Sequence, residues 1–125
     1  MDSSGDVDRM LPIYCSNGEW TAILVGIYIF DTHGEWIAWL DGTHVYTRDG
    51  MYAGYLANDG RILRQRVLEG RPMRPCPPAP AKIKPPSKVP LAPMFAELPW
   101  HVVDCFEEDP DIFMRISDLR PDWED

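Results

Sequence analysis

Glycine recurs at a fixed interval through the first half of this 125-residue chain. Five glycines stand eight residues apart, at positions 18, 26, 34, 42 and 50. A glycine at this interval would weaken a helix repeatedly, because each one costs about 1 kcal/mol relative to alanine. The interval instead predicts a turn every eight residues, with strands of about six residues between turns, close to the commonest strand length. We therefore expect a mainly β fold, with a meander of short antiparallel hairpins over residues 11–66.

The residues before these glycines indicate the type of turn. Asn17, His33, Asp41 and Asp49 suit or tolerate a hairpin turn, and only the Val25-Gly26 pair is unusual. Asn-Gly and Asp-Gly favour type I′ turns, in which both central residues have positive φ. We therefore predict two-residue turns at 17–18, 33–34 and 49–50.

The unit of repetition is two strands, or 16 residues, and several columns of it match in register. Each copy places an aromatic residue, a small residue and a leucine along one strand. The matched sets are Gly18, Gly34 and Gly50; Trp20, Trp36 and Tyr52; Ala22, Ala38 and Gly54; and Leu24, Leu40 and Leu56. A fourth copy begins at Ile62 and Leu63, but it lacks the second strand.

Pairing across a two-residue turn assigns the two faces of the meander. At His33-Gly34 it places Ile29 opposite Ala38 and Asp31 opposite Trp36, so that these four share one face. The small residue of each copy then lies near a common axis, where a larger side chain would clash. The other face is rich in aromatic residues, and the candidate binding residues lie on it: Tyr28, Phe30, Trp39, Tyr46 and Tyr55.

The stretch "IFDTHGEWIAWLDGTHVYTRDGMYAGYLANDGRIL" and its 16-residue register resemble the four-fold beta-flower domain family over residues 11 to 70. The proline-rich stretch that follows adds to the resemblance. The resemblance implies short β-hairpins around a pseudo-four-fold axis, with a proline-rich tail and no assigned activity. "RILRQRVLEG" departs from four complete hairpins, and the C-terminal segment is a candidate to complete the fourth.

Composition divides the chain into a flexible N-terminus (1–10), the hairpin domain (11–70), a proline-rich extended segment (71–99) and an acidic tail (100–125). Ten of the 13 prolines lie between Pro72 and Pro99, which favours an extended polyproline II arm. Arg74, Pro77 and Pro80 fit a pattern read by polyproline-binding domains, although such patterns arise easily here. In the tail, Pro110 and the apolar spacing that follows predict a short helix near 110–119.

Charge is distributed unevenly between these segments. The chain carries a formal net charge of −8, which argues against nucleic-acid binding. Residues 71–96 hold five basic and no acidic side chains, whereas the hairpin domain and the tail are both acidic. The bland interpretation is a solvated linker and tail. The alternative is that the arm or the tail docks on the aromatic face, with Trp39 and Tyr55 touching residues beyond Arg71.

No group of residues points to catalysis, a metal or a cofactor. His33, His44 and His101 have no partner at ligand spacing, and the three cysteines form no CxxC motif. Cys15 has no nearby base, and Asp31 is replaced by Cys15 and Thr47 in the other copies. We therefore predict that the protein is not an enzyme, with catalytic residues none, metal none and cofactors none.

Three functional hypotheses remain. The first is a small non-enzymatic protein-binding or scaffold module that binds a protein partner or its own C-terminal tail. The second is a structural homo-oligomer that associates through its aromatic face, and the third is a reader of a small sugar-like or choline-like ligand. The acidic N-terminus is unlike a signal peptide, and the apolar run "AILVGIYIF" is too short to cross a bilayer. We therefore expect a cytoplasmic protein without membrane contact.

Overall fold

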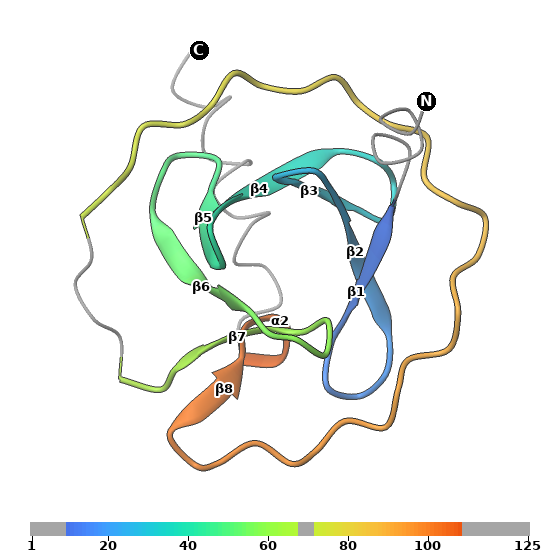
Figure 1. The fold of residues 1–125 in the computed structure, drawn as a ribbon, viewed down its shortest axis with the longest axis vertical. Coiled ribbons are helices and arrows are strands. Elements are labelled where there is room, and N and C mark those ends of the chain that lie inside the picture. The colour runs from blue at the N-terminus through green and yellow to red at the C-terminus, as the bar shows by residue number, and fades with distance from the viewer. Residues whose placement is uncertain (1–9, 68–71, 109–125) are drawn as a thin grey trace.

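A computed structural model of the protein describes residues 10–67 and 72–108, and its regular structure there is eight strands and one short helix. Each strand pairs antiparallel with the next along the chain, in the order β1 to β8, and the sheet curls into a half-barrel (Figure 1). The elements are β1 (Leu11–Tyr14), β2 (Trp20–Val25), β3 (Tyr28–Asp31), β4 (Trp36–Asp41), β5 (His44–Thr47), β6 (Tyr52–Leu56), β7 (Ile62–Gln65), β8 (Val102–Asp104) and α2 (Cys105–Glu108). The predicted mainly β meander is confirmed. The helix expected near 110–119 and most of the N-terminal segment lie outside the described residues.

The turn geometry predicted at 17–18, 33–34 and 49–50 is wrong, although the turns fall at the expected places. At the second turn the Gly34 N–H donates to the Asp31 carbonyl (3.0 Å), and the Asp31 N–H donates to the Glu35 carbonyl (2.8 Å). These bonds enclose three loop residues, a type I turn followed by a glycine bulge. Gly34 has a φ of +88°, and no described residue other than glycine has positive φ. The turn needs only one left-handed residue, and glycine adopts that conformation without strain.

The unusual Val25-Gly26 pair belongs to a different turn. Val25 ends β2 and pairs with Tyr28 of β3, so Gly26 and Ile27 are the two central residues. Gly26 has a φ of +64° and Ile27 has a negative φ, which is the pattern of a type II′ turn. Val25 therefore needs no turn propensity, because it is a strand residue.

Each of the first three hairpins contains a β-bulge. In β3–β4, Ile29 pairs with Ala38 as predicted, but the next pair is Phe30 with Trp36, which leaves Ile37 as an extra residue. The same shift occurs in β1–β2 and β5–β6. A bulge inserts one residue into one strand, so the alternation of faces breaks there.

The bulge overturns the predicted position of Trp36 on the face of Ala38. The Trp36 ring instead packs edge-on against Tyr28, with 6.0 Å between ring centroids. Ile37, expected on the other face, belongs to the buried core. All three strands that follow the glycine-bulge turns thus direct their first aromatic residue away from the core side.

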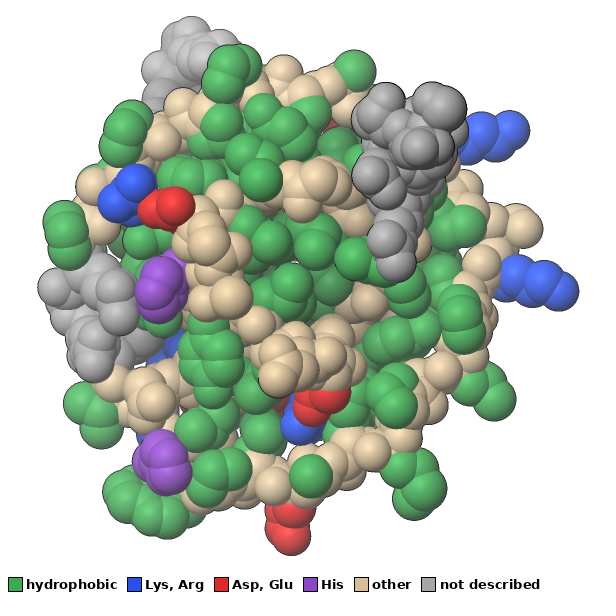
Figure 2. Space-filling model, in the orientation of Figure 1, with side chains coloured by type: hydrophobic (Ala, Val, Ile, Leu, Met, Phe, Trp, Pro, Cys, Tyr) green, Lys and Arg blue, Asp and Glu red, His purple; other side chains and the backbone are tan. Residues whose placement is uncertain are grey.

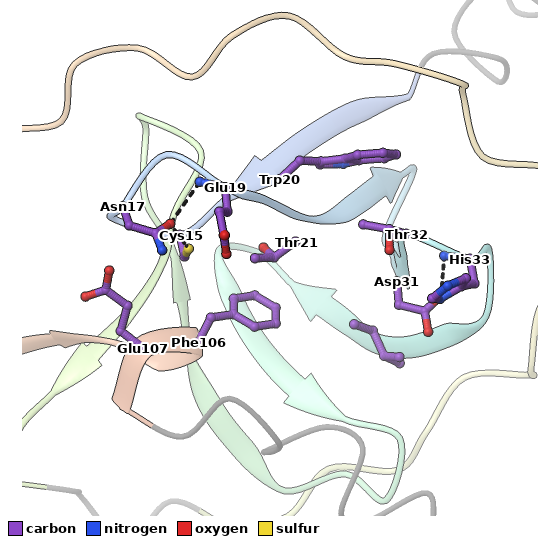
Figure 3. Close-up of a pocket in the computed structure, with 11 residues that line it drawn as sticks. Cys15, Asn17, Glu19, Trp20, Thr21, Asp31, Thr32, His33, Phe106 and Glu107 are labelled. Carbon is purple, nitrogen blue, oxygen red and sulfur yellow. Dashed lines mark hydrogen bonds between the residues drawn. The ribbon is translucent and has the colours of Figure 1, made fainter.

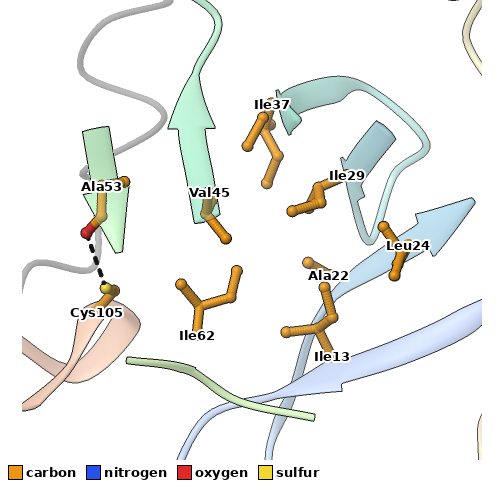
Figure 4. Packing of buried hydrophobic residues seen from close by; sticks show 10 residues of the cluster. Ile13, Ala22, Leu24, Ile29, Ile37, Val45, Ala53, Ile62 and Cys105 are labelled. Carbon is orange, nitrogen blue, oxygen red and sulfur yellow. Dashed lines mark hydrogen bonds between the residues drawn. The ribbon is translucent and has the colours of Figure 1, made fainter. Parts of the chain in front are cut away.

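The core is built from equivalent residues of the four hairpins (Figure 4). Ile13, Ile29, Val45 and Ile62 come from β1, β3, β5 and β7, and each is at most 1 % exposed. Four branched side chains that converge from successive hairpins exclude water from the middle of the half-barrel, and their burial provides the main stabilising term.

Small residues lie beside these branched side chains. Ala22 and Ala38 are fully buried, and a Cβ on Gly54 would collide with the Leu63 carbonyl and lie 2.9 Å from the Cys105 sulfur. Their burial agrees with the prediction for this position. No room remains there for a larger side chain.

The fourth hairpin is completed by a remote part of the chain. β7 pairs with β8, with Leu63 opposite Asp104 and Gln65 opposite Val102. Continuing this register by one residue places the fully buried Cys105 opposite Ile62. The strand missing from "RILRQRVLEG" is therefore supplied by residues 102–104.

The proline-rich segment runs around the outside of the half-barrel before it reaches β8 (Figure 1). Residues 72–99 have no helix or strand, and from Pro77 onward one residue in three is partly buried while most others are exposed. A three-residue period is that of a polyproline II helix with one edge turned inward. The inward row is Pro77, Pro80, Ile83, Pro86, Val89, Ala92, Phe95 and Leu98.

The arm, residues 72–99, is held to the hairpins at the bulge-turn glycines. The Ile83 N–H donates to the Gly34 carbonyl (3.1 Å), and the Arg74 N–H donates to the Gly50 carbonyl (2.9 Å). The Tyr28 hydroxyl also donates to the Pro78 carbonyl (3.0 Å). The arm therefore meets the hairpins in the reverse of their order along the chain.

Candidate functional sites

A pocket of about 520 Å³ opens between the first two glycine-bulge turns and α2 (Figure 3). This volume lies within the usual range for small-ligand sites, about 300–1,000 Å³. Its walls combine aromatic and aliphatic side chains with several polar groups. The lining residues are Cys15, Asn17, Glu19, Trp20, Thr21, Asp31, Thr32, His33, Ile37, Phe106 and Glu107.

Local hydrogen bonds shape the turns at the pocket mouth. Asn17 accepts a bond from the Glu19 N–H (2.9 Å) through its Oδ1. Asp31 accepts bonds from the His33 N–H (2.9 Å) and the Glu35 N–H (3.0 Å) through its Oδ1. Short side chains that bond to backbone two residues ahead stabilise such turns. They also hold the first residues of both loops in place around the pocket.

The remaining wall comes from the end of β8 and from α2. Asp104 is 3 % exposed, and its Oδ1 accepts bonds from the N–H groups of Phe106 (2.9 Å) and Glu107 (3.3 Å). Its Oδ2 accepts bonds from the Ser16 N–H and hydroxyl, both at 2.7 Å. One buried carboxylate thus starts α2, directs Phe106 to the pocket and ties the fourth hairpin to the first.

The pocket lining is acidic. Glu19, Asp31 and Glu107 contribute carboxylates, and no lysine or arginine is among the described residues that line it. Within residues 10–67 and 72–108 the carboxylates of Glu19 and Glu107 make no hydrogen bond or ion pair. Trp20 and Phe106 are partly buried beside them. The site therefore offers negative charge next to aromatic surface.

Cys15 lies at the inner end of the pocket and is 4 % exposed. Burial raises the pKa of its thiol, outweighing the lowering effect of the hydrogen bonds from Asn17 and Glu19. The neutral thiol donates to the Asn17 Oδ1 at 2.5 Å. The nucleophilic form of cysteine is the thiolate, so this environment does not activate Cys15 for attack.

Metal ligands do not cluster in the described part of the chain: no group of three His, Cys, Asp or Glu side chains there is placed to hold an ion. His33 lines the pocket but is exposed at the turn. Its backbone N–H, rather than its ring, makes the bond to Asp31. The geometry provides a place to bind a ligand, and no base positioned against a nucleophile.

The five candidate binding residues of the sequence lie on the outer side of the sheet, away from this pocket. Phe30, Trp39 and Tyr46 are 2 %, 5 % and 4 % exposed, whereas Tyr28 and Tyr55 are only partly buried. Trp39 stacks on Tyr46 with ring centroids 4.9 Å apart. Trp39 and Tyr46 thus pack on each other, and among the five only Tyr28 has a hydrogen bond to the arm in the described part of the chain.

Sequence reasoning missed the residues that line the pocket. Glu19 carried a signal, because glutamate follows the glycine at two equivalent turns, Glu19 and Glu35. Phe106 and Glu107 carried none, because their place depends on the pairing of β8 with β7. The three-residue apolar period of the arm was also readable from Pro77 onward, but it was not predicted.

No protein-family model matches the chain, and neither a curated protein nor a solved structure shows significant similarity to it. Among the described residues, no helix has the length and apolar character needed to span a bilayer. The inferences below therefore depend on the geometry of this chain alone.

Proposed function

We propose that this protein is a small non-enzymatic binding module that holds an organic cation in the pocket between the first two glycine-bulge turns and α2. The observation that carries the proposal is the set of three carboxylates beside Trp20 and Phe106, with no lysine or arginine among the described residues of the lining. This proposal selects the choline-like ligand among the sequence-based hypotheses.

The chemistry of the lining favours a substituted ammonium group. Carboxylates near a protein surface attract a cation by about 4 kcal/mol at 4 Å, before solvation costs are subtracted. The faces of Trp20 and Phe106 supply the apolar contact, and aromatic rings add a cation–π attraction of about 0.5–1 kcal/mol at exposed sites. A bare metal ion would gain little from these rings, whereas a methylated ammonium uses both kinds of wall.

Calorimetric titration with choline tests the proposal. Its neutral isostere, 3,3-dimethylbutan-1-ol, has the same shape without the charge, and methyl glucoside represents the sugar hypothesis. We expect weak binding of choline and no measurable binding of the alcohol. Equal binding of both would contradict recognition of charge, and binding of the glucoside alone would favour the sugar hypothesis.

Two adjacent glutamates provide a matched pair of variants. Glu107 lines the pocket, whereas Glu108 on the same short helix does not. Glu107→Gln should weaken choline binding about two- to fivefold, the effect of removing one exposed ion pair. Glu108→Gln should leave the affinity unchanged, because it removes the same charge from the helix but not from the lining.

We also propose that the chain is a member of the four-fold beta-flower family. Support comes from the four successive hairpins β1–β2, β3–β4, β5–β6 and β7–β8 and from the branched residue that each contributes to one core. An experimental structure in which the four hairpins are not related by rotation about a common axis would contradict this proposal.

A further inference from the structure

The outward side of the arm carries apolar side chains that the protein leaves in solvent. Leu91, Met94 and Trp100 are 96 %, 98 % and 76 % exposed. Exposed apolar side chains that lie close together on a protein surface usually mark an interaction site. Leu91 and Met94 stand three residues apart, one turn of a polyproline II helix, and Trp100 lies in the turn that precedes β8.

Their neighbours explain why the row points outward. Ala92, Phe95 and Leu98 are partly buried, and the Phe95 ring lies 4.5 Å from the Arg61 guanidinium carbon. With one of every three residues turned to the half-barrel, another row must face solvent. Leu91 and Met94 occupy that row, with Lys88 one turn earlier and the exposed Glu97 one turn later.

The backbone beneath this row is anchored at both ends. The Tyr14 hydroxyl donates to the Pro90 carbonyl (2.5 Å), and the Arg66 Nε donates to the Trp100 carbonyl (2.6 Å). The Arg66 N–H also donates to the His101 carbonyl (2.7 Å). An extended strand already fixed in its binding conformation loses little conformational entropy when a partner binds.

We propose that Lys88, Leu91, Met94 and Trp100 form a docking strip for a partner protein domain that reads polyproline II strands in an aromatic groove with an acidic flank. Residues three apart in such a strand lie about 9 Å apart. The strip therefore fits two apolar pockets at that spacing, with carboxylates one turn earlier to meet Lys88. This surface is separate from the proposed cation pocket.

Charge and position favour a protein groove over the other available partners. Residues 72–96 of the arm contain Lys82, Lys84 and Lys88 and no acidic residue, and Glu97 follows them. Basic side chains stand out from the rim of the molecule (Figure 2). The whole chain, however, carries a net charge of −8, which opposes adsorption to an anionic membrane. An acidic groove meets the local positive charge without approaching the acidic body.

The docking strip is distinct from the polyproline-recognition motif noted in the sequence. Pro77 and Pro80, which with Arg74 fit a polyproline-recognition motif, both belong to the inward row. Arg74 itself pairs with Asp41 at 2.8 Å. That motif is engaged with the half-barrel, so the accessible recognition surface is the later, apolar part of the arm.

The test uses the full chain against an array of purified SH3, WW and EVH1 domains, with binding measured by fluorescence polarisation. We expect micromolar binding to at least one domain with an acidic groove. The double variant Leu91→Ser/Met94→Ser should weaken it by about tenfold or more, the effect of losing two anchor side chains. Met73→Ser, another exposed methionine of the same arm, is the matched control and should bind like the parent chain.

The double variant should melt at the temperature of the parent chain, because both side chains are almost wholly exposed. Binding that is absent from the whole array, or that survives the double substitution, would overturn the strip. So would sedimentation showing that the parent dimerises and the double variant does not, since the row would then serve a second copy. Binding to vesicles containing phosphatidylserine that the double variant loses would equally assign the row to a membrane.

Discussion

The first three hairpins and the fourth have similar geometry but are closed in opposite ways. β1–β2, β3–β4 and β5–β6 are each joined by a short turn ending in a left-handed glycine. β7 and β8 are joined by residues 66–101, of which residues 72–99 run around the rim. Lengthening a flexible connection about tenfold costs roughly 2 kcal/mol in closure entropy. The fourth hairpin therefore depends on contacts that the other three do not need.

This difference places the candidate pocket at the least local part of the fold. Two of its walls are turns that form from adjacent residues, while Phe106 and Glu107 arrive only after β8 has paired. Binding at the pocket should consequently respond to any change that loosens the fourth hairpin. Substitutions in the fourth hairpin and in the first three test this difference in dependence.

The largest effect should come from removing the remote strand. A chain ending at Leu98 lacks β8 and α2, and so exposes Ile62 and the small-residue position filled by Cys105. We expect this chain to lose cooperative thermal unfolding, as measured by circular dichroism. A shortened chain that melts like the parent would show that the first three hairpins fold without the fourth.

A smaller loss of stability is expected from removing the hydrogen bonds by which Asp104 joins the two ends of the sheet. Asp104→Ala removes a buried carboxylate that accepts four hydrogen bonds, from Ser16, Phe106 and Glu107. Because Ser16 and Phe106 are only partly buried and Glu107 is exposed, their donors can bond to water in the variant. We therefore expect a decrease of about 3 kcal/mol in the free energy of unfolding, less than the sum of four bonds to a charged group at about 1.5–3 kcal/mol each. Urea denaturation measures it.

Asp31→Ala is the local counterpart, since Asp31 accepts bonds only within its own turn. It should cost about 1 kcal/mol, the ordinary contribution of such bonds. Equal losses for the two variants would mean that the fourth hairpin is no more dependent on its tie than the second is on its turn.

The next comparison measures how far stability depends on the contact between the arm and the second hairpin. Gly34→Ala and Gly18→Ala both force a residue with a Cβ into positive φ, which costs about 1–2 kcal/mol. Around Gly18 there is nothing within 4 Å of the added Cβ, whereas at Gly34 it collides with the Ile83 carbonyl. We expect Gly34→Ala to lose stability beyond Gly18→Ala and to be cleaved faster after Lys82, which precedes Ile83, under limited trypsin digestion. Identical digestion rates would show that the arm does not depend on this contact.

The smallest effect is a dependence on pH that arises in the first hairpin. Because the pKa of Cys15 is raised in the folded state, the unfolded chain releases this proton first as pH rises. Stability should be unaffected below the ordinary thiol pKa of 9.0 and fall above it, by at most about 1.4 kcal/mol per pH unit. Urea denaturation of the parent chain and Cys15→Ser at pH 8 and pH 10 measures it.

The exposed Cys76 of the arm is an internal reference for the low reactivity expected of the buried Cys15 thiol. At pH 8 we expect Cys76 to react with a thiol reagent well before Cys15, since reaction requires an accessible thiolate. Peptide mapping of the modified chain distinguishes the two sites. Faster modification of Cys15 would contradict the buried, neutral thiol.

Local features of this molecule could be predicted from the sequence, and remote ones could not. Gly18, Gly34 and Gly50 mark their turns because positive φ restricts the choice of residue. The bulge at Ile37 has no such marker, since any residue can be the extra one. A single unmarked insertion was enough to move Trp36 to the other side of the sheet.

The same distinction explains what was missed at the candidate sites. β8 has only three residues, Val102–Asp104, and so short a segment has no readable alternation. Its pairing is decided by the space left beside Ile62 rather than by its own pattern. The row of Leu91 and Met94 followed from a three-residue period that proline content alone does not reveal.

The structure at the two edges of the sheet also affects whether separate molecules can associate through them. A half-barrel has two edge strands, and unpaired edges promote association between molecules. β1 carries Pro12, which has no N–H to donate, and its Tyr14 N–H is taken by the Gly60 carbonyl at 2.9 Å. β8 is too short to template another strand. The turn before β7 and the short β8 therefore also help to guard the molecule against edge-to-edge aggregation.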